Sequence, residues 1–197
     1  MNKKELTNRI KIIWKGIYYQ SIENCVITIS ESDIDIKSQI IGHHQDFIYN
    51  IEYYIKTNKQ WETQYFIIDS EINHLKTKIE AEKVNDNWII NGEQKNELKL
   101  CTDIDISLTP FTNTLPINRL KFNIEQKNKI DVLYINILEQ KIIPVQQNYT
   151  KLSEFEYKYE NISNDFEAII KVDETGLVIN YPELFERTDK MTNANIV

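Results

Sequence analysis

Glycine and histidine are scarce in this sequence, and their scarcity excludes several classes of enzyme. The 197 residues include only four glycines and three histidines. Four scattered glycines cannot build the glycine-rich loop that holds phosphates in P-loop and dinucleotide-binding proteins. No serine stands in a Gly-x-Ser-x-Gly elbow, and no cysteine is placed for an obvious Cys–His pair. We therefore expect no cofactor and assign no catalytic residue, and the sequence favours a protein that is not an enzyme.

The sequence gives equally little support for a metal site or a disulfide bond. His43 and His44 are adjacent, so in a strand they would face opposite ways, and His74 is isolated. Cys25 and Cys101 are the only cysteines, and they lack a close metal-binding spacing. No secretory signal and no transmembrane stretch is recognisable. We expect no metal site, reduced thiols and a cytoplasmic location.

The charge balance argues against nucleic acid as a partner. The formal net charge is −7 and the sequence pI is about 5.1. An acidic chain repels phosphate backbones, and no cluster of Lys and Arg reverses the sign locally. With 41% hydrophobic and 27% charged residues, the composition is that of a globular protein. We expect one domain over residues 1–197, while the oligomeric state stays open.

Period-two alternation of apolar and polar residues dominates the chain and predicts a mainly β fold. It is clearest at residues 46–56, where Phe47, Tyr49, Ile51, Tyr53 and Ile55 alternate with polar residues. Further strands are expected at residues 11–19, 23–30, 33–36, 60–69, 72–84, 87–91, 98–108, 129–138, 142–149, 154–160, 166–172 and 177–181. About a dozen strands with short links cannot remain one flat open sheet, so we expect a rolled or two-layered antiparallel sheet.

One helix is expected, over residues 113–122. Thr112 or Asn113 can act as its N-cap, and Pro116 falls within the first turn, where a missing N–H costs nothing. Ile117 and Leu120 would then share one face. A helix this short is unstable alone in water, so it must pack against the sheet.

Two aspartates precede this helix on one face of an expected strand. Asp103, Asp105 and Ser107 would lie opposite Ile104 and Ile106. Carboxylates at i and i+2 lie about 7 Å apart. Three interpretations remain open: a solvated strand face, a polar site that orients a ligand, or a carboxylate pair that performs catalysis.

Arg119 stands out because the chain has 20 lysines and only three arginines. An arginine suggests that planar, forked donation is needed, and Asp103 or Asp105 would be a natural bidentate partner. Such a pair could tie the helix to the sheet, or Arg119 could contact a ligand.

Tyrosines occupy many positions that the alternation places inward, namely Tyr49, Tyr53, Tyr65, Tyr134, Tyr157 and Tyr159. Each buried hydroxyl needs a partner, so a rolled sheet with inward tyrosines could leave an amphipathic cavity. Ordinary strand propensity explains the same enrichment, because tyrosine favours strands.

The chain resembles a known family, the putative glycolipid-binding proteins of bacteria. The resemblance lies in CTDIDI (101–106), TPFTNTLPINRL (109–120), VDETGLVINYP (172–182) with Arg187, and the positions of Trp61 and Trp88. Two positions depart from the family pattern, since Asn118 stands where a second arginine is usual and Phe185 where a tryptophan is usual.

The resemblance implies a spiral β-roll, in which one long antiparallel sheet wraps around a single helix, and a lipid or glycolipid ligand. Its signature positions are Asp103, Asp105, Thr112, Asn113, Thr114, Arg119, Asp173 and Tyr181. Three hypotheses follow: a non-enzymatic binder of an amphipathic ligand, an enzyme that acts on a sugar or lipid headgroup through Asp103 and Asp105, or a signature that only builds the fold.

Overall fold

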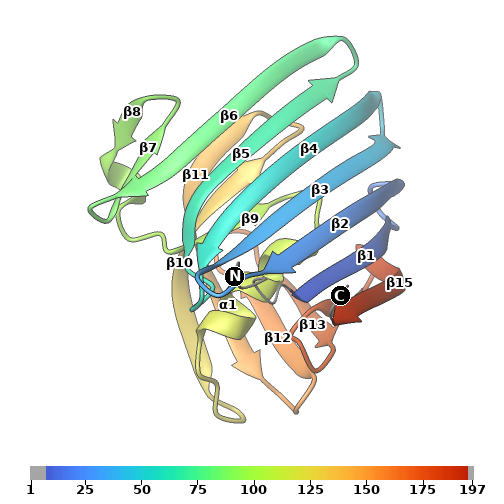
Figure 1. Ribbon diagram of the computed structural model, residues 1–197, viewed down its shortest axis with the longest axis vertical. Coiled ribbons are helices and arrows are strands. Elements are labelled where there is room, and N and C mark those ends of the chain that lie inside the picture. The colour runs from blue at the N-terminus through green and yellow to red at the C-terminus, as the bar shows by residue number, and fades with distance from the viewer. Residues whose placement is uncertain (1–7, 195–197) are drawn as a thin grey trace, which may run out of the picture.

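One continuous sheet of 15 strands makes up most of the computed structural model, which describes residues 8–194 (Figure 1). The first half contains β1 (Asn8–Gly16), β2 (Ser21–Ile29), β3 (Asp33–His44), β4 (Phe47–Asn58), β5 (Thr63–Ile72), β6 (Leu75–Val84), β7 (Asn87–Ile90) and β8 (Glu93–Lys95). The second half contains β9 (Asp103–Ile106), β10 (Lys127–Asn136), β11 (Lys141–Lys151), β12 (Glu156–Asn161), β13 (Phe166–Val172), β14 (Val178–Tyr181) and β15 (Phe185–Ala194).

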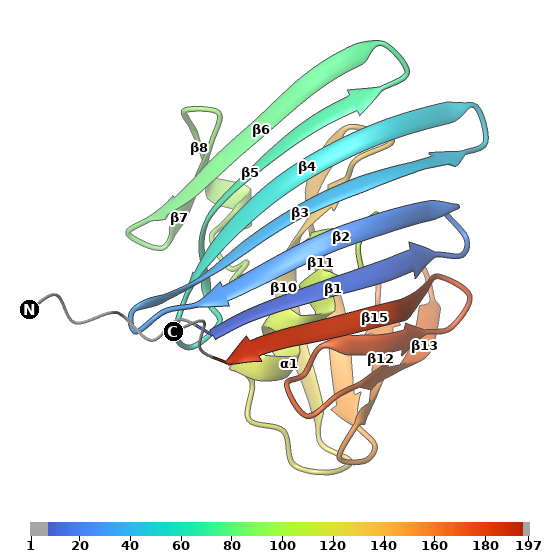
Figure 2. The same ribbon diagram turned by 45° about the vertical axis from the view of Figure 1, so that its right-hand side comes forward.

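The strand order runs from β8 down to β1, continues to β15, and then runs back to β9. The first and last strands therefore pair with each other in the middle of the sheet (Figure 2). The two edges of the sheet, β8 and β9, do not meet, so the roll is open. The predicted antiparallel rolled sheet is confirmed.

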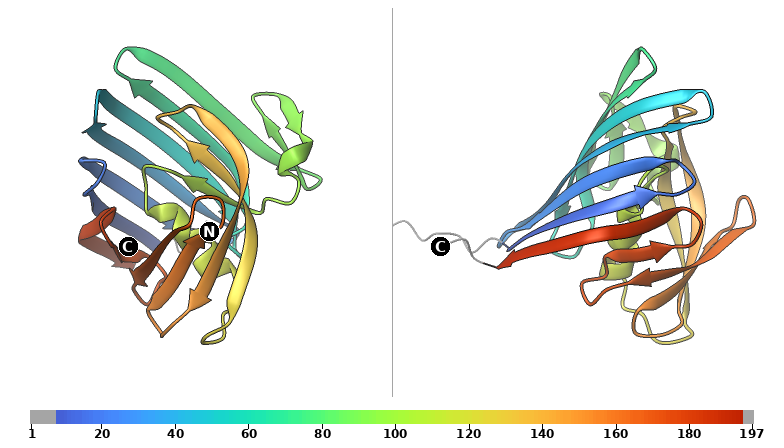
Figure 3. Two further views of the ribbon diagram at one scale, coloured as in Figure 1. Left: turned by 180° about the vertical axis from the view of Figure 1, so that it is seen from behind. Right: turned by 90° about the vertical axis from the view of Figure 1, so that its right-hand side faces the viewer.

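The parallel pairing of β9 with β10 explains where the helix lies. Neighbouring strands in all the other pairs are antiparallel. A parallel pair needs a crossover between its strands, and here the crossover carries a 3-10 turn, η2 (Phe111–Asn113), and the helix α1 (Thr114–Arg119). Seen from the side, α1 lies in the space that the bent sheet encloses (Figure 3).

The inward side chains form two hydrophobic clusters, of which the first lies along β1–β7 and extends to β9 and part of β10, and the second lies along β10–β15. Ile12, Ile51 and Ile55 belong to the first cluster, and Val132 and Ile170 belong to the second. The helix bridges them, because its Leu115 packs in the first cluster and its Ile117 in the second. Removal of α1 would expose both clusters, so the helix is an integral part of the core.

Trp14 joins the two halves a second time. Its ring is fully buried in β1, and its Nε1 donates a hydrogen bond of 2.9 Å to the carbonyl of Val178 in β14. A buried indole N–H normally requires such a partner.

Several local expectations are wrong. The helix is shorter than residues 113–122, although Asn113 is its N-cap as expected, without a side-chain cap hydrogen bond. The strand expected over residues 98–108 contracts to β9, and an additional 3-10 turn, η1 (Asn96–Leu98), takes up its beginning. Tyr65 is only half-buried, and its hydroxyl donates to the exposed Glu80 carboxylate, so it lies outside the core.

Candidate functional site

Strand β9 carries the two aspartates, and neither faces open water. Asp103 is 1% exposed, and Asp105 is half-buried. The expectation of a solvated strand face is therefore wrong. The physical reason is that β9 lies inside the roll, where a parallel strand is buried on both faces.

Asp103 is bound by Arg119, the last residue of α1. Arg119 Nε donates to Oδ1 over 3.0 Å, and its Nη2 donates to Oδ2 over 2.6 Å. Burial raises the pKa of Asp103, and the guanidinium opposes that shift. The expected bidentate bond is confirmed with Asp103, and it ties the end of the helix to the sheet.

Asp105 has a different environment, in which both donors are neutral. The Thr112 hydroxyl donates to Oδ1 over 3.1 Å, and Gln147 Nε2 donates to Oδ2 over 2.7 Å. Burial raises the pKa of Asp105, and these two hydrogen bonds oppose the shift only in part. The carboxylate makes no ion pair with any residue between 8 and 194.

A cavity of about 350 Å³ opens beside Asp105. Seven aromatic side chains line it, from six different elements or turns: Tyr18, Tyr19, Tyr134, Tyr159, Phe166, Tyr181 and Phe185. Tyr134 is the direct partner of Asp105 in the β9–β10 register. Asn113 and Thr109 line the cavity on the side of the helix. Glu183, in the turn between β14 and β15, also lines the cavity. The cavity thus combines apolar rings, amides and carboxylates.

Three of the tyrosines present hydroxyls that the protein itself does not use. The phenol oxygens of Tyr19, Tyr134 and Tyr181 form no side-chain hydrogen bond within residues 8–194. Burial raises the pKa of Tyr19 to about 12, and it also raises the pKa values of Tyr134 and Tyr181. All three are therefore neutral at pH 7 and can donate a hydrogen bond into the cavity.

The tyrosines of the core behave differently. Tyr53 donates to Glu23 over 2.6 Å, Tyr49 donates to the Tyr19 carbonyl over 2.7 Å, and Tyr149 donates to Asn113 Oδ1 over 2.8 Å. Their hydroxyls are satisfied inside the protein. The amphipathic cavity expected from inward tyrosines is present, but of the tyrosines expected to face inward only Tyr134 and Tyr159 line it.

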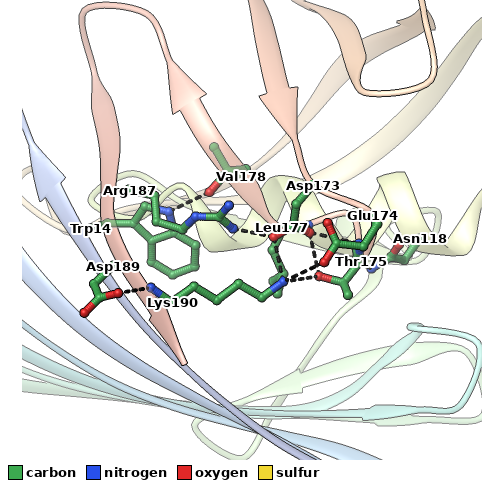
Figure 4. A network of polar contacts seen from close by, with 10 residues as sticks. All are labelled: Trp14, Asn118, Asp173, Glu174, Thr175, Leu177, Val178, Arg187, Asp189 and Lys190. Carbon is green, nitrogen blue, oxygen red and sulfur yellow. Dashed lines mark hydrogen bonds and ion pairs between the residues drawn. The ribbon is translucent and has the colours of Figure 1, made fainter. Parts of the chain in front are cut away.

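Asp173 organises a second polar network, shown in Figure 4. Its carboxylate accepts hydrogen bonds from Arg187, from Lys190 Nζ over 2.8 Å and from the Thr175 hydroxyl over 2.6 Å. Burial alone would raise the pKa of Asp173, but these donors hold the pKa well below its usual range. The network binds the turn after β13 to β15.

The helix touches the same turn through Asn118. Its Nδ2 donates to the Thr175 carbonyl over 3.0 Å. Gly176 has a φ of +74°, and a Cβ at that position would lie 2.3 Å from Asn118 Oδ1. Asn118, where an arginine is usual in the family pattern, thus serves as an uncharged contact between α1 and this turn.

The eight signature positions divide into two groups. Asp105, Asn113 and Tyr181 line the cavity. Asp103, Thr112, Thr114, Arg119 and Asp173 lie outside its wall, and their side chains are buried or bonded to other parts of the protein. Thr112 still acts on the cavity through its hydrogen bond to Asp105.

Sequence reasoning missed Glu23 in β2. Its side chain is 2% exposed, and Oε1 accepts hydrogen bonds from Ser38 over 2.7 Å, Tyr53 over 2.6 Å and Thr109 over 3.0 Å. Oε2 has no partner within the described residues. Burial raises the pKa of Glu23 to about 7. Glu23 stands two residues before Cys25 and four before Ile27, so the period-two pattern places all three side chains on the same inward face. This pattern could have indicated a buried glutamate.

Two other depressions lie on the outer surface, and neither collects as many aromatic side chains as the cavity beside Asp105. One depression, of about 610 Å³, lies at the β1–β2 and β2–β3 ends and is lined by aliphatic, glycine and a few polar residues without a carboxylate. Another, of about 410 Å³, lies over the outer face of β2–β5. Within residues 8–194, no three His, Cys, Asp or Glu side chains are grouped to hold a metal ion. None of the helices in that range has the length and apolar character needed to cross a membrane.

Comparison with known proteins gives one family and one structural neighbour. The family model described as Putative glycolipid-binding matches residues 11–187. A crystal structure of a DUF1089 family protein from Pseudomonas aeruginosa is 29% identical, with a TM-score of 0.73. The similarity covers 84% of this chain and 91% of that one. No curated protein matches the chain.

Proposed function

Since this chain belongs to the Putative glycolipid-binding family, we propose that it binds the polar headgroup of a glycolipid or related lipid in the cavity beside Asp105. The unpartnered hydroxyls of Tyr19, Tyr134 and Tyr181 are the observation that carries this proposal. These hydroxyls are open to the cavity and are not occupied by other groups of residues 8–194, and the hydroxyls of a sugar can both donate to them and accept from them.

The size and shape of the cavity suit a headgroup better than a whole lipid. Its volume of about 350 Å³ is at the small end of the range for ligand pockets. The side chains of α1 fill the space at the centre of the roll, where Leu115 is fully buried. At the rim, Tyr18 and Phe166 are 53% and 37% exposed and offer apolar surface to the first carbons of a tail.

The positions of Asp103 and Asp105 favour ligand binding over hydrolysis by this pair of carboxylates. Hydrolysis by a carboxylate pair requires two carboxyl groups that face one bond. Asp103 is engaged by Arg119 and lies outside the cavity wall, so Asp103 and Asp105 do not face one bond in the cavity. We propose that Asp105, Asn113 and Tyr181 contact the headgroup, while Asp103, Thr112, Thr114, Arg119 and Asp173 hold the fold around it.

Titration calorimetry with hexyl glucoside, a short glycolipid mimic, tests this proposal. The double variant Tyr134→Phe/Tyr181→Phe removes two hydroxyls and keeps both rings, so we expect binding about tenfold weaker. Tyr65→Phe removes a hydroxyl that bonds Glu80 on the outer face, and it should bind like the wild type. Native mass spectrometry of the purified protein would also identify any lipid that copurifies. Absence of binding, or equal binding by the double variant, contradicts the proposal.

A further inference from the structure

The three signature aspartates, of which Asp103 and Asp173 are buried and Asp105 is half-buried, differ in the charge of their partners. Asp103 is paired with Arg119, and Asp173 is paired with Arg187 and Lys190. Asp105 alone has only the neutral donors Thr112 and Gln147 among the residues that the structure describes. A carboxylate withdrawn from water is expensive without a positive partner. The protein supplies that partner twice, and it does not supply it for Asp105.

The side chains that line the cavity also lack a positive charge. They include two carboxylates, Asp105 and Glu183, and no lysine, arginine or histidine. An anionic headgroup such as a phosphate or sulfate would find no positive side chain there and would be repelled by both carboxylates. A neutral headgroup would leave Asp105 with the same partners that it has now.

The aromatic rings beside Asp105 are arranged as a continuous surface. Tyr159 and Tyr181 have ring centroids 6.0 Å apart, and Tyr181 and Phe185 are 6.2 Å apart. Phe185 in turn lies 5.8 Å from Tyr19. The faces of such rings attract cations, and several rings around a carboxylate form the kind of cage that recognises ammonium groups.

We propose that the ligand of this cavity carries a positively charged ammonium group, which Asp105 receives as an ion pair and the surrounding tyrosine rings receive through cation–π contacts. This inference rests on the proposed function, because it concerns the chemistry of the headgroup in the same cavity. An amino sugar and a quaternary ammonium share this chemistry. The free tyrosine hydroxyls are suited to the remaining oxygens of the headgroup.

Calorimetry with a matched series of ligands tests the inference at pH 6.5, where the amine of an amino sugar is protonated. The series consists of hexyl 2-amino-2-deoxyglucoside, whose amine is cationic when protonated, its N-acetyl derivative, hexyl glucoside and hexyltrimethylammonium. We expect the amino glucoside to bind the wild type at least about tenfold more tightly than the N-acetyl derivative, because a charge-assisted hydrogen bond is stronger than a neutral one.

Two variants locate the preference. Asp105→Asn keeps the shape of the side chain and removes its charge, so the preference for the amino glucoside should disappear. Asp69→Asn makes the same change of net charge at an exposed position of β5 and should keep the preference. If Asp105→Asn does not fold, as judged by circular dichroism, the ratio of amino to acetylated affinities in the wild type decides alone.

The outcomes separate this inference from the proposed function. Equal or tighter binding of the N-acetyl derivative, or a preference that persists in Asp105→Asn, overturns the ammonium inference and leaves headgroup binding intact. Failure of all four ligands to bind counts against the proposed function itself. Binding of hexyltrimethylammonium would support the inference with a quaternary ammonium as the ligand, and its failure beside a tightly bound amino glucoside would support it with an amino sugar.

Discussion

Arg119 holds Asp103 with two parallel hydrogen bonds, of 3.0 Å from Nε and 2.6 Å from Nη2, at the point where α1 ends against β9. The arginine side chain is 17% exposed and the aspartate 1%. One residue therefore fixes both the end of the helix and the strand that carries Asp105. The geometry of the cavity depends on a pair of residues that does not line it.

We expect Arg119→Ala to destabilise the protein by about 3 kcal/mol, because it leaves a buried carboxylate without its partner. Arg119→Lys should recover only part of this loss, since a lysine cannot form the forked contact. Urea unfolding monitored by circular dichroism measures both. Lys127→Ala, which breaks the exposed pair with Glu160, is the control and should cost less than about 1 kcal/mol. An Arg119→Ala variant no less stable than Lys127→Ala would contradict the structural role of this pair.

Asp173 should make the protein sensitive to acid. Its folded-state pKa is lowered by Lys190, Thr175 and Arg187, against the effect of burial. A lowered pKa contributes stability that is present above the ordinary aspartate pKa, about 3.9, and is lost as the pH falls below it. We therefore expect Asp173→Asn to be less stable than the wild type at pH 7, by about 3 kcal/mol, and to lose less stability between pH 5 and pH 3.

Urea unfolding at several pH values between 3 and 7 measures this difference, with Asp69→Asn as a control for the change of charge. If the wild type and Asp173→Asn lose stability in parallel on acidification, Asp173 does not hold the turn as described. The result would not depend on ligand, because the network lies outside the cavity.

Gly176 allows the turn after β13 to approach the helix. Its φ of +74° disfavours other residues, and an added Cβ would lie 2.3 Å from Asn118 Oδ1. Gly92 has a similar φ of +82°, but a Cβ there would meet nothing within 4 Å. We expect Gly92→Ala to cost about 1 kcal/mol and Gly176→Ala to cost at least about 1 kcal/mol more.

Thermal or urea unfolding of the two alanine variants measures the effect of the close contact with Asn118. Both variants place an alanine at a positive φ, so the difference between them comes from the contact. In the double variant Gly176→Ala/Asn118→Ala the steric conflict is gone, so the two changes should cost less together than the sum of their separate effects. Equal costs for Gly92→Ala and Gly176→Ala would show that the turn does not pack against Asn118.

Most strands could be predicted from the sequence because the roll buries one face of each of them. Residues 166–172 were predicted with the bounds that β13 has. The strand β15 was missed because its inward positions include Arg187 and Lys190, which bind Asp173 instead of packing in a core. Charged residues on both faces leave no alternation to read. The pairing of β15 with β1 is what joins the two halves, and it links residues nearly the full chain length apart.

The candidate site was predictable only in part. The rarity of arginine pointed to Arg119 and to a carboxylate partner near it in sequence. Of the two partners of Asp105, Gln147 could not be foreseen, because it lies 42 residues away in β11. The cavity draws aromatic residues from several strands, and only the curvature of the sheet brings them together. Local patterns do not encode that curvature.

Glu23 should make the stability of the protein fall as the pH rises, which is opposite to the effect of Asp173 and occurs at higher pH. Burial raises its folded-state pKa from 4.5 to about 7, against the hydrogen bonds from Tyr53, Ser38 and Thr109. The folded state then binds a proton more tightly than the unfolded state, so stability falls as the pH rises from about 4.5 to about 7 and is level above that. The loss should be of the order of 3 kcal/mol. Tyr53 and Cys25, which lie beside Glu23, stay neutral in this range because burial raises the pKa of both.

Glu23→Gln removes the titrating group, so its stability should change less than that of the wild type between pH 5 and pH 7.5. The absolute stability of the variant is a poorer test, since the new amide NH2 would replace Oε2, which has no partner within residues 8–194. Urea unfolding across this pH range gives the slope for each protein. Glu52→Gln, at an exposed position of β4, is the matched control and should keep the wild-type slope. Identical slopes for the wild type and Glu23→Gln would mean that Glu23 titrates as an ordinary glutamate, and that the hydroxyl donors of Ser38, Tyr53 and Thr109 outweigh its burial.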